Sequence, residues 1–362
     1  MHDRELFEKA FSPLHASPDT LTEVRKTMRN EKKTRRALGK SAVVAIAAAL
    51  TLTIAVAGGI VTLIRADVSP ADKVDDTTHH AFTDDLDATT PTVDDGKGTA
   101  VSVPDMERIP GDIQTTQRLV GQYLSKLDAE MTVDGNTIKL GTFLIDENGL
   151  GLLTYSVENP SGVSYTDVGY GECIDLPIQP ILRLRSPDEG TAMSAKCYVD
   201  KDASTDTRLQ VVLYFAAGKD FQKGDDFYFT VCDSARQPYS ISIQPQTYVP
   251  VKTMTAKNGE IVTLSALGMT IVNPDPSREI HTDEVLVNAK DGSSFAVESS
   301  SKNLMNWVIG SITGDGQVAF ENYTYVFNRL VDVNEVGSVT LTGYYYNLDG
   351  SDNDTVSLTY QP

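Results

Sequence analysis

Histidine is scarce in this chain, and that scarcity limits the chemistry it could perform. There are five histidines, of which His79 and His80 fall in a polar segment and only His281 falls in the β-rich part of the sequence. A Ser-His-Asp or Cys-His arrangement in that part could draw only on His281, which lies in a stretch rich in proline and charge. The sequence therefore indicates a protein that is not an enzyme.

Carboxylates are abundant, with 50 Asp and Glu, so a paired-carboxylate glycosidase is open on inventory alone. The acids gather in turns, however, and Trp307 is the single tryptophan that a carbohydrate platform could use. The segment 349–354, DGSDND, offers oxygens to Ca²⁺, but its spacing differs from that of an EF-hand and fits a hairpin turn. We expect no cofactor and no metal site, while calcium at 349–354 stays an open alternative.

The three cysteines, Cys173, Cys197 and Cys232, are an odd number without C-x-x-C spacing. Such a set does not fit a zinc site, and any disulfide would leave one thiol over. We expect buried thiols and leave their pairing open.

An uncharged run at residues 41–64, SAVVAIAAALTLTIAVAGGIVTLI, dominates the first part of the chain. As a helix with about 1.5 Å rise per residue it would reach roughly 36 Å, enough to cross a bilayer. The sequence thus predicts a transmembrane helix at 41–64. Two alternatives are a signal peptide cleaved after Ala55-Val56-Ala57 and a buried core helix.

The charge changes sign across this run. Residues 1–65 carry 11 Lys or Arg and 6 Asp or Glu, whereas the rest of the chain carries 20 and 44. By the positive-inside rule, we expect a single-pass protein of the cell membrane with residues 1–40 in the cytoplasm and the C-terminal region outside. The acidic region has no basic face for phosphates, which argues against nucleic acid as a partner. The basic flank consists of Lys32, Lys33, Arg35, Arg36 and Lys40.

Residues 1–40 are predicted to form a helical tail with two apolar stripes. Ser17 and Pro18 fit the start of the second helix, as N-cap and first helical residue. Forty residues cannot bury both stripes in a core of their own, so we expect them to dock a partner. The candidate docking residues are Leu6, Phe7, Phe11, Leu14, Leu21, Val24 and Met28.

The string AFSPLHASPDTLTEVRKTMRNEKKTRRA, followed by the Ala- and Val-rich run, resembles the N-terminus of a family of single-pass membrane proteins from Gram-positive bacteria. Its most specific part is LHASP at residues 14–18. Members of the family are described as anti-sigma-factor-like, have a β-rich extracytoplasmic region and are largely of unassigned function. The resemblance implies a tail that could hold a sigma factor, although the tail lacks the cysteines of the zinc-binding anti-sigma motif.

After the run, residues 65–105 have the Asp-, Thr- and Pro-rich composition of a disordered acidic stalk. A short amphipathic helix at 113–127 and many short alternating runs follow, which predicts two tandem antiparallel β-sandwiches of immunoglobulin-like type. We place the first domain, with its leading helix, at 106–246 and the second at 247–362. An echo of Met131-Thr132 in Met254-Thr255 supports this division.

Two functional hypotheses follow. In the first, the chain is a membrane-anchored, non-enzymatic regulator with an extracytoplasmic region that senses or binds an unknown extracellular ligand or protein. Its tail docks a partner, for which a cytoplasmic sigma factor is the candidate. In the second, it is a cell-surface binding or adhesion protein whose tail is only a flank for membrane insertion.

Overall fold

The structure is a computed structural model, and it describes residues 51–56, 59–83, 92–94, 100–102, 111–164, 166–167, 174–175, 178–188, 190, 192–218, 221–272, 278–299, 304–305, 308–310, 322–347 and 354–362. These residues are mainly β, as the alternating sequence patterns predict. They form three large sheets, two small ones and two short α-helices. The small sheets pair β4 (Thr92–Asp94) with β5 (Ala100–Ser102) and β10 (Thr166–Asp167) with β11 (Ile174–Asp175).

A five-stranded and a seven-stranded sheet share one hydrophobic core. Phe143 of the larger sheet meets Phe227 of the smaller one with 5.4 Å between ring centroids, and Tyr155 meets Phe229 at 5.1 Å. In spatial order the smaller sheet is β1 (Thr51–Val56), β2 (Gly59–Arg65), β16 (Pro238–Ile243), β15 (Phe227–Cys232) and β12 (Ile181–Leu184). The larger is β13 (Ser194–Thr205), β14 (Arg208–Ala216), β9 (Leu150–Glu158), β8 (Asn136–Ile145), β6 (Ser125–Asp128) and β3 (Asp67–Pro70), with β7 (Glu130–Val133) also on β8.

The C-terminal part forms one ten-stranded sheet around a second core. Its first and last strands, β22 and β23, are separated by only two residues of sequence, so the sheet must curl until its ends approach each other. The spatial order is β22 (Leu304–Met305), β21 (Ser294–Ser299), β20 (Arg278–Ala289), β25 (Val336–Asn347), β26 (Asp354–Gln361), β17 (Lys252–Ala256), β18 (Ile261–Leu264), β19 (Gly268–Val272), β24 (Asn322–Val326) and β23 (Val308–Gly310).

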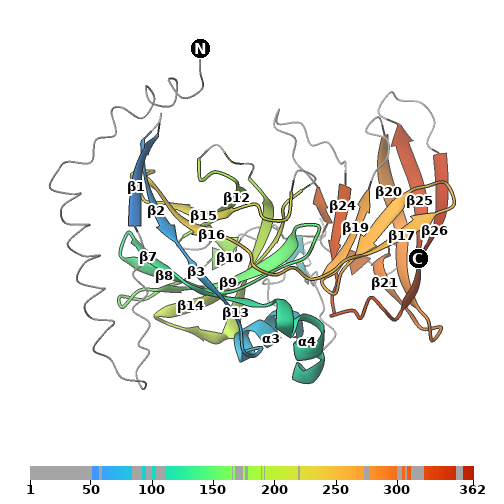
Figure 1. Cartoon of the computed structure of the whole chain (residues 1–362), viewed down its shortest axis with the longest axis horizontal. Helices are drawn as coiled ribbons and strands as arrows, with labels where there is room; N and C mark the ends of the chain where they lie inside the picture. The colour runs from blue at the N-terminus through green and yellow to red at the C-terminus, as the bar shows by residue number, and fades with distance from the viewer. Residues whose placement is uncertain are drawn as a thin grey trace, which may run out of the picture. The chain divides into compact units, whose positions relative to one another are not determined.

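Two helices lie together beside the seven-stranded sheet (Figure 1). They are α3 (Asp76–Thr83) and α4 (Ile113–Val120), the latter continued by the 3₁₀ turn η1 (Gly121–Tyr123). Asp112 is the N-cap of α4, and its carboxylate accepts the backbone N–H of Thr115 at 2.8 Å. The helix predicted at 113–127 thus exists, but it ends before Leu124 and the chain continues into β6.

A third hydrophobic cluster joins the helices to both β-rich parts. It contains Phe82 of α3 and Val120 of α4, Leu152 and Tyr214 from the seven-stranded sheet, and Val326 from the ten-stranded sheet. The two parts that the sequence divides at residue 247 therefore share buried apolar surface.

The predicted transmembrane helix is wrong. Within the part of the chain that the structure describes, neither helix is long and apolar enough to cross a membrane. Residues 51–56 and 59–65 instead form β1 and β2, an antiparallel pair in which Thr51 faces Ile64, and β2 runs parallel to β16. Strand pairing therefore supplies hydrogen bonds that a spanning helix would make within itself. The single-pass membrane location inferred from the helix is contradicted by the same finding, while residues 41–50 lie outside the described part.

Two further expectations need correction. The stretch expected to be a disordered stalk contains β3, which pairs with β6, and α3, which buries Ala81 and Phe82. The smaller N-terminal sheet is not purely antiparallel, because β2 and β16 are parallel. The echo around Met131 and Met254 does correspond to two similar hairpins, in which Met131 pairs with Ile138 and Met254 with Val262.

Candidate functional site

Three carboxylates are buried among the described residues, and they are the candidates for functional chemistry. They are Asp146, Asp200 and Glu260, with exposed fractions of 2%, 6% and 7%. An ionised carboxylate in a protein interior is unfavourable unless donors surround it. What engages each group therefore decides whether it is structural or reactive.

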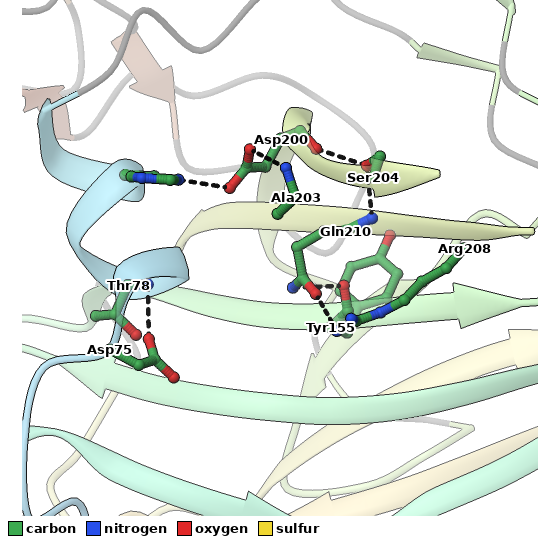
Figure 2. A network of polar contacts seen from close by, with 9 residues as sticks. Asp75, Thr78, Tyr155, Asp200, Ala203, Ser204, Arg208 and Gln210 are labelled. Atoms are coloured by element: carbon green, nitrogen blue, oxygen red, sulfur yellow. Dashed lines mark hydrogen bonds and ion pairs between the residues drawn. The ribbon is translucent and has the colours of Figure 1, made fainter. Parts of the chain in front are cut away.

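Asp200 joins β13 to helix α3. Its Oδ2 lies 3.3 Å from Nδ1 of His80, and its Oδ1 accepts the backbone N–H of Ala203 at 3.0 Å (Figure 2). Helix α3 is held in place at its start by Asp75, whose Oδ1 accepts the N–H of Thr78 at 2.8 Å. The hydroxyl of Thr78 in turn donates to Thr142 of β8 at 3.1 Å. The helix is thus fixed to the sheet by the polar contacts of Thr78 and His80.

The polar network continues from Asp200 along the irregular end of β13. The register of β13 against β14 shifts between Asp200 and Thr205, and the hydroxyl of Ser204 donates to the carbonyl of Asp200 at 2.5 Å. Ser204 also accepts the N–H of Gln210, whose Nε2 donates to the carbonyl of Tyr155 at 3.1 Å (Figure 2). The two contacts of Ser204 lie in the segment where the β13–β14 register shifts, and the contact of Gln210 ties that segment to β9. The network therefore stabilises a bulge.

Asp146 follows β8 in the turn to β9. Its Oδ1 accepts the N–H groups of Asn148 at 2.8 Å and Leu150 at 3.0 Å, and its side chain also bonds Ser265, which precedes β19. Burial raises the pKa of this carboxyl to about 6, against the opposing effect of these hydrogen bonds. The group links the two β-rich parts.

Glu260 lies in the second core beneath β25 and β26. Its Oε1 accepts hydrogen bonds from the hydroxyl of Tyr345 and, at 2.8 Å, from Nδ2 of Asn258, while Oε2 accepts from the hydroxyl of Tyr360 at 3.5 Å. Burial is the main cause that raises the pKa of Tyr360, and the charge of Glu260 adds to it. One carboxylate thereby bonds β25, β26 and the turn before β18.

A different kind of site lies on the outer face of the ten-stranded sheet. His281 of β20 and Tyr344 of β25 are directly opposite in register and stack, with centroids 5.0 Å apart and planes 6° apart. Tyr346 meets His281 edge-on at 5.9 Å and is 44% exposed. We call these three residues the aromatic row. It differs from the carboxylate clusters because it faces solvent.

The structure places only some of the residues singled out from the sequence. The docking residues of the tail, the basic flank, Trp307 and residues 349–353 all lie outside the described residues, whereas Asp354 begins β26. His79 and His80 belong to α3, where Nδ1 of His79 lies 3.2 Å from the hydroxyl of Thr116. Cys197 is half-buried near Tyr155, and Cys232 is exposed, so the expectation of a buried thiol does not hold for Cys232. No group of three His, Cys, Asp or Glu residues in the described ranges could hold a metal ion.

Sequence reasoning missed the three buried carboxylates. Asp146 lies in the polar turn sequence DENG, and Asp200 and Glu260 carry no local signal of burial, because His80, Tyr345 and Tyr360 are distant in sequence. Because successive residues of a strand point to opposite faces, Tyr344 and Tyr346 lie on the face opposite to Tyr345, and Tyr346 is exposed.

Comparison with known proteins identifies no family. No family model matches this chain, and no curated protein matches it. One solved structure, described as a conserved domain protein from Bacillus anthracis, is similar over 66% of this chain and 90% of that chain. The two are 12% identical with a TM-score of 0.39, a likeness too distant to carry an argument about function.

Proposed function

We propose that this chain is a non-enzymatic regulator that works by binding other molecules, with a β-sandwich body as scaffold and a tail that docks a partner. The observation that supports it best is the engagement of the buried carboxylates Asp146, Asp200 and Glu260 by donors of the fold itself. A general acid or base must direct a proton or a lone pair at its substrate. Carboxylates that join turns, strands and a helix serve stability instead.

The tail supplies the docking part of the proposal. Its apolar stripes, centred on Phe7 and on Val24, suit insertion of a helix into a groove of a partner protein. Under the resemblance described above, that partner is a sigma factor.

The test is direct binding of the full-length chain to a purified sigma factor of the same organism, measured by calorimetry. Replacing Leu21 by Asp puts a charge on the apolar stripe and should weaken binding by about tenfold or more, which is about 1.4 kcal/mol. Thr22→Asp is the matched control, because it adds the same charge about one quarter-turn away from Leu21. Its affinity should stay within about twofold of the original.

Two results would contradict docking by the tail. One is the absence of binding to every sigma factor of the organism. The other is an equal loss of affinity for the sigma factor in Leu21→Asp and Thr22→Asp.

A second candidate function places the binding surface on the body and leaves the tail without a partner. It is favoured by the aromatic row, since large aromatic side chains exposed side by side are typical of contact surfaces. Deletion of residues 2–30 separates the two candidates. If the tail docks the partner, the deletion should abolish binding of that partner. If the body carries the binding surface, the shortened chain should still bind its partner.

A further inference from the structure

The aromatic row is a pre-formed surface. Tyr344 and Tyr346 are two positions apart on β25, so both point away from the core, whereas Tyr345 between them points inward to Glu260. On the inner side of β20, Thr282 donates to Glu298 and contacts the hydroxyl of Tyr325 at 3.2 Å. These contacts fix the register of the strand that carries His281. The rings are therefore held in place before any ligand arrives, which lowers the entropy lost on binding.

The charges beside the row are negative. Glu284 pairs in register with Thr342, two positions from Tyr344, and the bulge residue Asp283 is exposed next to His281. The chain beyond residue 65 carries 44 Asp or Glu and 20 Lys or Arg. A ligand that complements this surface carries positive charge.

The fold itself places cations on aromatic rings elsewhere. The guanidinium of Arg329 lies 4.4 Å from the ring centroid of Phe295, and the ammonium of Lys223 lies 6.0 Å from that of Tyr248. Electron-rich rings attract cations through their quadrupole, most strongly where carboxylates stand nearby. The aromatic row combines both features on an exposed face.

We propose that the row formed by His281, Tyr344 and Tyr346, with Glu284, binds lysine- or arginine-containing peptide segments of a partner protein. This inference rests on the proposal that the chain acts by binding, and it names a surface and a ligand class for the body. Tyr346, the exposed ring of the row, receives the side-chain cation, because His281 already covers one face of Tyr344, and Glu284 neutralises the charge.

The experiment titrates the full chain into three labelled peptides of about ten residues and follows fluorescence anisotropy. Every second residue is lysine in the first peptide and glutamate in the second, with serine at the other positions, and the third peptide consists of serine alone. The lysine peptide should bind at least about tenfold more tightly than the serine peptide, and the glutamate peptide should not bind. Tyr346→Thr should weaken binding of the lysine peptide about fivefold, and Glu284→Gln should weaken it less and remove part of its salt dependence.

Ile261→Thr is the matched control, because Ile261 is 39% exposed on another strand of the same sheet, and it should leave binding unchanged. Thermal unfolding of each variant shows whether it is folded. If Tyr346→Thr does not fold, Glu284→Gln still tests the site. Equal affinity for the lysine and serine peptides would overturn the inference. So would binding of a neutral oligosaccharide at the row together with no binding of the lysine peptide.

The tail variant Leu21→Asp distinguishes this inference from docking by the tail, since it should leave binding of the lysine peptide unchanged. If the lysine peptide does not bind while a sigma factor does, the row is not a peptide site and the tail proposal stands. If the lysine peptide binds and no sigma factor does, the row is supported and the tail proposal fails.

Discussion

Nδ1 of His80 and Oδ2 of Asp200 lie 3.3 Å apart, although 120 positions separate the two residues in sequence. The contact connects a helix of eight residues, too short to be stable alone, to a bulged strand of the seven-stranded sheet. Asp200 is nearly buried, while the side chain of His80 keeps 30% of its exposure.

We predict that His80→Ala loosens α3 without unfolding the body. Because His80 is partly exposed, the contact contributes about 1 kcal/mol, so the amides of α3 should exchange with solvent about fivefold faster. Hydrogen exchange followed by mass spectrometry measures this. Lys73→Ala, at an exposed position just before the helix, should leave exchange unchanged. Unaltered exchange in the His80 variant would show that apolar packing alone holds the helix.

Asp146 should make stability depend on pH in a direction opposite to most carboxylates. Its pKa is about 6 when folded and 3.8 as a model value, so the folded state binds the proton more tightly. The stability linked to this proton is complete below about pH 4 and is lost as the pH rises to about 6. The loss is about 3 kcal/mol.

The comparison that isolates this effect is Asp146→Asn, which cannot ionise. Urea unfolding at pH 4 and pH 7.5 should show the original protein losing about 2.4 kcal/mol more than the variant on going to the higher pH, because the unfolded carboxyl is already partly ionised at pH 4. An identical pH dependence in both proteins would mean that the carboxyl titrates alike in the folded and unfolded states.

Removing the hydroxyl groups of the two tyrosines that bond Glu260 should lower the free energy of unfolding by unequal amounts. Tyr345→Phe removes a donor from Oε1 in the core and should cost about 1 to 3 kcal/mol, because the buried carboxylate keeps only Asn258 on that oxygen. Tyr360→Phe removes a long contact of 3.5 Å and should cost less. Denaturant unfolding of the two single variants and the double variant checks both the order and the coupling through the shared carboxylate. Equal costs would contradict the geometry.

Two glycines should differ in their tolerance of alanine. A Cβ at Gly268 would lie 2.1 Å from the carbonyl oxygen of Tyr325 and 2.6 Å from Cδ2 of Leu150, so Gly268→Ala should cost about 2 to 3 kcal/mol. At Gly224, φ is +97° and no atom lies within 4 Å, so Gly224→Ala carries only backbone strain, about 1 kcal/mol. Thermal unfolding compares the two. A larger loss at Gly224 would be inconsistent with the close approach at Gly268.

The β-rich character of the chain was predictable because alternation is a local signal. Among the short runs of the β-rich region, residues 181–184 form β12 and residues 268–272 form β19. Turn chemistry was equally readable, since Asp134 and Gly135 both have positive φ between the paired strands β7 and β8.

The membrane helix was mispredicted because length and lack of charge do not distinguish a spanning helix from strands buried by neighbours. The alternation Thr51-Leu52-Thr53-Ile54 and the glycines at 58 and 59 were signals of a hairpin in the same run. Helix α3 could not be predicted from its own polar sequence. Its stability depends on contacts with Asp200 and Tyr214, which local reasoning does not reach.

The hydrophobic cluster shared by α3, α4 and both β-rich parts joins the segments on either side of residue 247. Leu152 and Tyr214 on one side and Val326 on the other are buried in it. Separating the halves would expose that apolar surface to water on both fragments. The two parts should therefore melt together as one cooperative transition, and neither should behave as a well-folded fragment when expressed alone.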